Sequence, residues 1–242
     1  MIYAKFLTNA PLTKLIRDLE FEQLSILAYG IPVSSLRGVL DVVPVTGSTA
    51  KEVTAATTVI GGRLTLCIKL PNTYTFSAVK SLTAYLESKS VSGGITTWTR
   101  CTEQRFYTLD KTTRLRAYRI GFVNLLGGID YHTFYGAETK TASVSQITVQ
   151  KELPTPFVSS DRGEKALSSV YGEAVEVFSD FITETTALWL SELMSSPEVW
   201  RVEAGLNIPI VVTMQSQTIK SNDMIQMQLT FRDANQRITQ NG

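Results

Sequence analysis

Any reactive chemistry in this sequence would have to be built on one histidine, His132, and two cysteines, Cys67 and Cys101. A serine or cysteine nucleophile needs an adjacent base held by a third group, and a zinc ion needs three or four ligands. His132 lies in an apolar run, which favours a structural imidazole, and the cysteines lack the spacing of a metal site. We therefore expect no catalytic residue and no metal, and a hydrolase ranks third among the functions considered.

The spacing of glycines and acidic residues supports neither a phosphate loop nor a calcium loop. Residues 47–51 and 136–141 each contain a glycine and a lysine, but neither has the second glycine before the lysine that lets a backbone wrap a phosphate. An acidic series lacks the ligand order and the turn glycine of a calcium loop, so it is expected to face solvent: Glu173, Glu176, Asp180 and Glu184. No cofactor is expected.

One segment, residues 100–119, interleaves basic and aromatic side chains. This composition is typical of a strand platform for single-stranded nucleic acid. The near-neutral charge of the whole chain instead favours the interpretation that residues 100–119 form one side of a hairpin that faces solvent or an interface. The candidate contacts with another subunit or with nucleic acid are Arg100, Arg105, Arg114, Arg116, Tyr118 and Arg119.

Most of the chain up to residue 150 has the alternating pattern of β-strands. The clearest case is residues 63–70, where every second residue is Leu or Ile. We expect further strands at residues 1–7, 20–29, 35–45, 95–109, 113–124, 131–135 and 139–150, with a hairpin turn at 110–112. Helical spacing predicts short helices at residues 11–19 and 77–88, and residues 46–62 are expected to form a long loop or arm.

The prolines at 154 and 156 mark a candidate domain boundary, because they exclude a helix and disfavour a central strand. We expect a β-rich domain over residues 1–153 and a helix-plus-hairpin module over 157–242. In that module, residues 166–181 favour a strand, although a helix is also compatible. Residues 183–196 predict a helix ended by Pro197, and two alternating strands then flank a turn at 221–223. The expected fold class is α+β, mainly β, with antiparallel sheets or a β-sandwich and two or three short helices.

Length, charge and hydrophobic content limit the class of protein further. The chain has 242 residues, 43% of them hydrophobic, which suffices for one large or two small cores. Its 23 basic and 22 acidic residues give no global field toward nucleic acid or an anionic membrane, so protein partners are expected. No apolar run approaches the roughly 18 residues of a membrane helix, and no secretion signal is found. These features predict a reducing compartment and no membrane insertion.

Several short runs occur in a fixed order over about half the chain. They are residues 126–136 (LGGIDYHTFYG), 161–163 (DRG), the helix with Ala187, Leu190 and Leu193, residues 196–199 (SPEV) and 208–212 (IPIVV), and the final Leu229, Phe231, Ala234 and Asn235. In this order they resemble a structural tail or neck family of tailed bacteriophages, notably crAss-like and related phages of Bacteroidetes hosts. Residues 1 to 110 carry no such resemblance.

The resemblance implies a virion protein, made in the bacterial host cytoplasm, that forms a homo-oligomeric ring around the DNA passage. A portal-proximal collar, a hub and a distal tail position all stay open. Its partners would be copies of itself, adjacent tail, neck or portal proteins, and DNA only transiently. Residues 46–62 and 151–164 are polar and costly to order alone, so they are candidate arms for a neighbouring copy. The alternative function is a single-stranded nucleic-acid-binding module built on residues 100–119.

Overall fold

The computed structural model describes residues 4–18, 20–27, 35–54, 58–60, 63–112, 117–153, 155–156, 158–159, 163–220, 224–235 and 238–241. The chain forms two compact units. The first unit comprises Met1–Leu115, Gly121–His132 and Thr183–Glu198, and the second comprises Arg116–Ile120, Thr133–Ile182 and Val199–Gly242. Each unit is therefore built from three separate segments of the chain.

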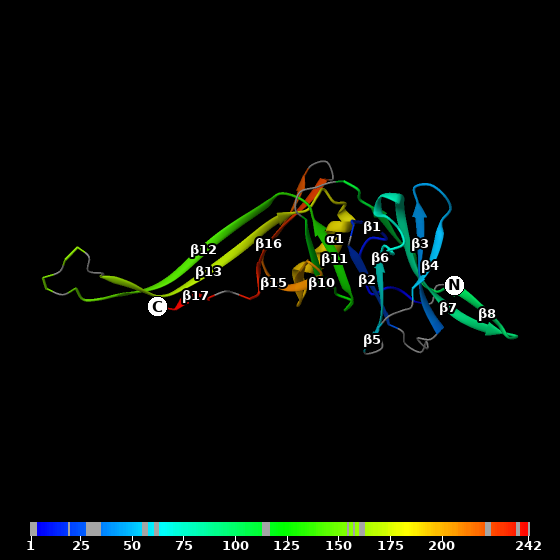
Figure 1. Cartoon of the computed structure of the whole chain (residues 1–242), viewed down its shortest axis with the longest axis horizontal. Coiled ribbons are helices and arrows are strands. Elements are labelled where there is room, and N and C mark those ends of the chain that lie inside the picture. Colours follow the sequence, from blue (N-terminus) through cyan, green and yellow to red (C-terminus); the bar gives the residue numbers. More distant parts are fainter. Residues whose placement is uncertain are drawn as a thin grey trace. The chain divides into compact units, whose positions relative to one another are not determined.

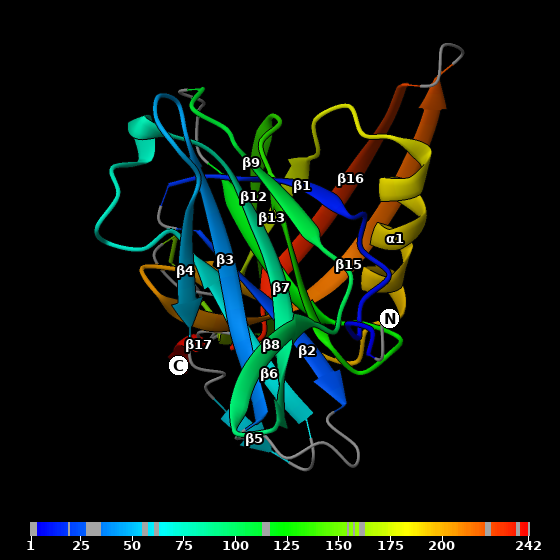
Figure 2. The ribbon, with the colours of Figure 1, turned by 90° about the vertical axis from the view of Figure 1, so that its right-hand side faces the viewer.

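The first unit contains two β-sheets, whose strands can be followed in Figure 2. The strands of the six-stranded sheet are β1 (Thr13–Ile16), β3 (Leu36–Pro44), β4 (Ala50–Thr54), β7 (Val79–Ser92), β8 (Ile95–Arg100) and β9 (Arg105–Leu109), in the order β1-β9-β7-β3-β4 with β8 beside β7. The three-stranded sheet consists of β2 (Phe21–Leu27), β6 (Arg63–Lys69) and β5 (Thr58–Ile60) in that order. The pair β1 and β9 is parallel, and the other paired strands of these two sheets are antiparallel.

The core of the first unit lies between the inward faces of these two sheets. Because successive residues of a strand point to opposite faces, Leu64, Leu66 and Ile68 of β6 turn inward together and are fully buried. Leu82 and Leu86 of β7 do the same from the six-stranded sheet, and all five belong to one hydrophobic cluster. The first unit is therefore a β-sandwich.

The first unit also includes the helix α1 (Glu184–Ser195). The Thr183 side chain caps it by accepting a hydrogen bond from the backbone of Thr186 at 3.3 Å. Its inner side buries Ala187, Trp189, Leu190 and Leu193. No helix in the described part of the chain is long and apolar enough to cross a membrane.

The second unit contains an eight-stranded sheet. Its strands are β10 (Tyr118–Val123), β11 (Ile129–Phe134), β12 (Glu138–Gln150), β13 (Glu164–Phe178), β14 (Val199–Glu203), β15 (Leu206–Lys220), β16 (Met224–Asp233) and β17 (Ile238–Asn241). The order is β11-β10-β14-β15-β16-β13-β12, with β17 beside β13. This unit contains the first half of β10 and the end of β11. Met227, Leu229 and Phe231 alternate inward from β16 and are buried, so the sheet has a core on one face at this point.

The fold class predicted from the sequence is confirmed: the protein is mainly β, with antiparallel sheets and a helix. The structure also confirms the helix at residues 183–196 as α1 and the strands at 20–29, 35–45, 63–70, 131–135, 139–150 and 166–181 as β2, β3, β6, β11, β12 and β13. The final hairpin is present as β15 and β16, paired from Ile210 opposite Asp233 to Lys220 opposite Met224, with a shift in register between Val212 and Met214. The turn predicted at residues 221–223 lies outside the described residues.

The two helices predicted in the first half are wrong. Residues 77–88 form a short 3₁₀ turn, Phe76–Ala78, and then β7. The apolar residues of this segment fit a helix as well as a strand, but Ala84 is buried between Leu82 and Leu86, which completes the alternation of a strand. Within residues 11–19 the strand β1 forms instead, because it pairs with β9, about ninety residues away in the sequence.

Four further expectations need correction. Residues 46–62 are not a long loop, since β4 pairs with β3 from Val42 opposite Ala50 to Gly38 opposite Thr54, and β5 pairs with β6. The strand predicted at 95–109 is two strands, β8 and β9. The hairpin predicted around 110–112 is absent, because β9 and β10 belong to different sheets. In the strand predicted at 1–7, residues 4–7 form none, and residues 1–3 are outside the described residues.

The prolines taken as a domain boundary lie in the connection between β12 and β13. These two strands pair with one another from Glu138 opposite Val177 to Gln150 opposite Glu164, so the chain remains in the second unit on both sides of that connection.

Candidate functional site

The most unusual part of the second unit is the β12–β13 ribbon, a long two-stranded hairpin (Figure 1). At the base of the ribbon, Ala174–Phe178 of β13 pair with β16, and farther along β17 pairs with β13 at Ser168, Ser169 and Val170. No described strand pairs with the outer edge of β12. The backbone N–H and C=O groups of that edge are available to another strand.

The β12–β13 ribbon exposes apolar side chains on both of its faces. Val144 lies opposite Tyr171, and they share one face, with exposed fractions of 60% and 37%. Ile147 and Val149 lie on the other face, exposed by 63% and 44%. Where β16 and β17 do not pair with β13, the ribbon has two strands, and a two-stranded ribbon has no core of its own and is marginally stable in water. The apolar positions are therefore suited to contact with another surface.

At the base of the β12–β13 ribbon, the second unit has a groove of about 390 Å³. Among the residues that line it are Tyr118, Lys140, Tyr171, Arg201, Phe231 and Asp233. Arg201 binds Asp233 through two nitrogens, Nε to Oδ1 at 2.9 Å and Nη2 to Oδ2 at 3.1 Å, and it also contacts Glu203. The hydrogen bonds from Asp233 and Glu203 raise the pKa of Arg201 despite burial.

The groove presents aromatic rings and paired charges. Lys140 Nζ lies 3.3 Å from Glu138 Oε1 and 3.9 Å from Glu173 Oε1. The Tyr118 hydroxyl donates to Glu138 at 2.5 Å. No histidine, cysteine or serine is among the described residues that line the groove, so these residues offer a polar and aromatic contact surface.

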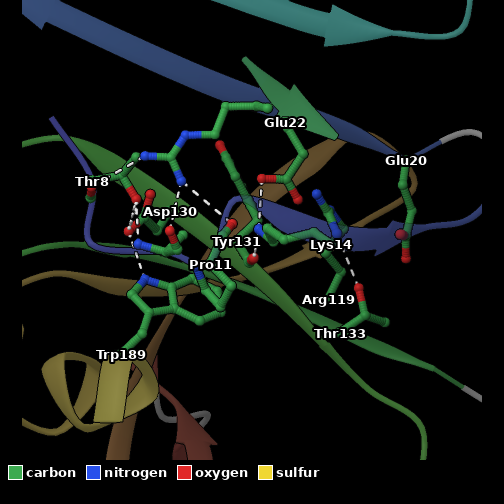
Figure 3. Close-up of polar contacts among 12 residues, drawn as sticks. Thr8, Pro11, Lys14, Glu20, Glu22, Arg119, Asp130, Tyr131, Thr133 and Trp189 are labelled. Carbon is green, nitrogen blue, oxygen red and sulfur yellow. Dashed lines mark hydrogen bonds and ion pairs between the residues drawn. The ribbon is translucent and has the colours of Figure 1, made fainter. Parts of the chain in front are cut away.

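The first unit contains a buried carboxylate with three side-chain hydrogen-bond donors, Asp130 of β11 (Figure 3). Its Oδ2 accepts hydrogen bonds from Thr8 Oγ1 at 2.8 Å, Asn124 Nδ2 at 2.9 Å and Trp189 Nε1 at 2.8 Å. Burial raises the pKa of Asp130, and the charge of Lys14 together with these three donors acts in the opposite direction. We call Asp130, Thr8, Asn124 and Trp189 the Asp130 centre.

Lys14 connects the Asp130 centre to the neighbouring strands. Its Nζ donates to Glu22 Oε2 and to the Tyr131 carbonyl, both at 2.7 Å, and lies 4.8 Å from the Trp189 ring centroid. These contacts join the segment before β1, the strands β1, β2 and β11, and α1 within one unit. All three donors to Asp130 come from the protein itself, so the arrangement serves to hold these segments together.

Two glycines of the run at 126–136 are required by close packing. A Cβ on Gly128 would lie 2.0 Å from the Leu7 carbonyl oxygen, and one on Gly136 would lie 2.6 Å from the Phe178 carbonyl oxygen. The run at 126–136 therefore includes a tight turn next to Asp130. The sequence analysis missed the roles of Asn124, Asp130 and Trp189, and the available signal was an Asp between two glycine-marked turns and a Trp on the inner side of a helix.

The candidate contact residues that the structure describes lie in different environments. Arg100 is exposed at the end of β8. Arg105 is 5% exposed and donates to the Ala10 carbonyl at 2.6 Å. Tyr118 and Arg119 are also buried, with Arg119 Nη1 donating to Thr133 Oγ1 at 2.9 Å. Arg114 and Arg116 lie outside the described residues.

The residues weighed for catalysis or metal binding are dispersed as well. His132 packs edge-on against Trp189, with the ring centroids 5.9 Å apart. Cys67 is exposed and Cys101 is buried, and burial raises the pKa of each thiol. Within the described part of the chain, no group of three or more His, Cys, Asp or Glu residues is placed to hold a metal ion.

Comparisons with known proteins find similar chains among the solved structures, two of them from gene transfer agent particles. No protein-family model and no curated protein matches the sequence. A chain from the tail of an empty GTA particle, computed with helical refinement and C6 symmetry, is 14% identical over 51% of this chain and 96% of that chain, with a TM-score of 0.32. A chain from the virion of a native gene transfer agent (GTA) particle is 14% identical over 49% of this chain and 91% of that chain, with a TM-score of 0.31.

Proposed function

We propose that this protein is a non-enzymatic structural component of a bacteriophage-like virion tail or neck, and that copies of it associate through the β12–β13 ribbon. The open edge of β12 is the observation that supports association most directly. The virion setting is supported by the sequence resemblance of the second half of the chain. In the virion, the copies form a ring around the DNA passage and contact adjacent tail, neck or portal proteins.

The open edge favours pairing with another strand. β12 has 13 residues, and all of them except Glu138 are exposed. A strand that adds to such an edge gains main-chain hydrogen bonds, while alternate side chains determine which strand fits. Proteins that do not use an edge in this way protect it with charges, prolines or a covering segment. Between Thr141 and Gln150, β12 contains no charged residue and no proline.

The exposed apolar residues add a second contribution to association. Covering apolar surface contributes about 25 cal/mol per Å², and Val144, Tyr171, Ile147 and Val149 provide such surface on both faces of the ribbon. A second copy supplies the same ribbon, so like segments can associate without a different partner. A head-to-tail contact between identical copies closes into a ring when its rotation divides the circle evenly.

The test is the mass of the purified protein in solution as a function of concentration. We expect the unchanged protein to form a closed oligomer, measured by light scattering or mass photometry. Val144→Glu places an uncompensated charge on the ribbon and should shift the protein to monomer without altering its circular dichroism. Val45→Glu is the matched control, because Val45 is exposed to a similar degree, 58%, outside any strand.

Two results would contradict the proposal. One is an unchanged protein that stays monomeric at every concentration. The other is a Val144→Glu variant that assembles as well as Val45→Glu, since association would then use a different surface.

A further inference from the structure

One face of the six-stranded sheet in the first unit carries a group of cations around a tryptophan. In register, Arg37 of β3 lies opposite Glu87 of β7, and Glu87 lies opposite Arg100 of β8. Lys89, two residues beyond Glu87 on β7, lies opposite Trp98 of β8. Residues that face one another across antiparallel strands point to the same side of the sheet. These five side chains therefore share one face.

The carboxylate in this group is already neutralised. Glu87 is 5% exposed, and it binds Arg37 Nη2 at 2.7 Å and Lys51 Nζ at 2.5 Å. Burial acts to raise the pKa of Glu87, but the hydrogen bonds from Lys51 and Arg37 outweigh it and lower that pKa. Glu87 is therefore ionised at neutral pH and its single charge is shared by two cations.

Two more cations on this face remain available to a ligand. Lys89 and Arg100 are exposed, and neither forms an ion pair with any described residue. The other carboxylate on this face, Asp41, accepts a hydrogen bond from the Tyr85 hydroxyl at 3.4 Å. The face thus has four cations, Arg37, Lys51, Lys89 and Arg100, against two carboxylates.

Trp98 is held in place by one of these cations. The Arg37 guanidinium carbon lies 4.2 Å from the centroid of the Trp98 ring, a cation–π contact. Trp98 is partly exposed, and its strand β8 is joined only to β7 among the described strands. An indole that is fixed on one side and lies on an edge strand can present its other side to a flat ligand.

We propose that this face of the β7–β8 hairpin binds single-stranded nucleic acid, with a base stacked on Trp98 and phosphates contacting Lys89 and Arg100. Cations alone would suit any anion, including an acidic protein segment. The aromatic ring held between them favours nucleic acid, because bases stack on aromatic side chains irrespective of sequence. A duplex is disfavoured, since its bases are already stacked. This activity goes beyond the proposed structural role and uses different residues.

The test is binding of a fluorescein-labelled oligothymidylate of about 16 nucleotides, followed by fluorescence anisotropy. With two phosphate contacts, the logarithm of the affinity should fall with the logarithm of salt concentration with a slope of about −1.4. Lys89→Gln and Arg100→Gln should each reduce that slope by about 0.7. Trp98→Ala should weaken binding roughly tenfold, and Trp98→Phe should restore most of it, because a phenyl ring also stacks.

Lys69→Gln is the matched control, because Lys69 is an exposed lysine in β6 of the three-stranded sheet; it should leave affinity and slope unchanged. Three results would overturn the proposal. The first is no salt-dependent binding by the unchanged protein. The second is an equal loss in Lys69→Gln, which indicates general charge attraction. The third is loss of binding in Lys89→Gln and Arg100→Gln but not in Trp98→Ala, which would indicate a surface for acidic protein segments.

Discussion

The Asp130 centre of the first unit buries a polar group, whereas the β12–β13 ribbon of the second unit exposes apolar groups. In the Asp130 centre a carboxylate is buried and three side chains donate to it. In the ribbon, Val144 and Ile147 are more than half exposed, and one strand edge is unpaired among the described strands. The first arrangement is complete within one chain, whereas the second leaves apolar side chains and a strand edge open to contact with another surface. The conformation of the first unit and the association of copies are therefore expected to respond to different substitutions.

The largest expected change in the free energy of unfolding is that of Trp189→Ala, which removes one member of the Asp130 centre. Trp189 is 3% exposed, contacts Phe122 and donates to Asp130. Removing a large buried aromatic side chain costs about 3–5 kcal/mol. The free energy of unfolding, from urea denaturation followed by circular dichroism, should fall by that amount. Val144→Ala in the ribbon should change the free energy of unfolding by less than about 0.5 kcal/mol. Comparable losses in the two variants would contradict the difference between the Asp130 centre and the ribbon.

A smaller loss is expected from Gly128→Ala. The added Cβ would lie 2.0 Å from a backbone oxygen of Leu7, so the turn beside Asp130 must shift, at a cost of about 1–3 kcal/mol. Gly163→Ala is the control from the connection of the ribbon, where the nearest atom would be 3.9 Å away. The same denaturation measurement should show a loss only for Gly128→Ala. An unchanged Gly128→Ala variant would mean that the turn tolerates a side chain.

The smallest expected effect is a change in pH dependence in Asp130→Asn. Burial raises the pKa of Asp130 above its unfolded value of about 3.9. The folded state therefore prefers the protonated carboxyl, and the resulting stability is fully present below about pH 3.9 and lost as pH rises through the raised pKa. Asparagine cannot ionise, so the variant should gain stability relative to the unchanged protein as pH rises through this window.

Asp110→Asn provides the control of opposite sign. Burial acts to raise the pKa of Asp110, but Thr112 and Arg17 outweigh it and lower that pKa. The unchanged carboxylate therefore stabilises the fold above about pH 3.9, and Asp110→Asn should lose stability relative to the unchanged protein as pH rises. Urea denaturation across a series of pH values measures both. Parallel pH profiles for the two variants would contradict the different environments described for these carboxylates.

The sequence predicted elements whose signals are local. Thr183 and Pro197 delimit α1, and its inner side follows helical spacing. The strand β6 alternates cleanly, and the two strands of the last hairpin alternate on either side of a polar turn. In each of these cases the residues that determine the element lie within about 15 positions of one another, so periodicity and capping were sufficient.

The sequence did not predict elements that depend on distant partners. Residues 11–19 contain apolar residues at helical spacing, yet they include β1 because β9 pairs with it. Arg105 was expected on a surface, but carbonyl groups of Thr8 and Ala10 surround its guanidinium group. Those partners lie more than ninety positions away in the sequence. Basic residues are usually exposed unless paired, and the pairing here is a tertiary property.

The division of each unit into three stretches affects both synthesis and inheritance. The first unit ends with Thr183–Glu198, so a ribosome must translate Thr133–Ile182, a large part of the second unit, before the first can close. Likewise, no uninterrupted piece of the gene encodes one unit without a portion of the other. A recombination event between related genes cannot exchange a single unit cleanly, and the two must be inherited and adapted as a pair.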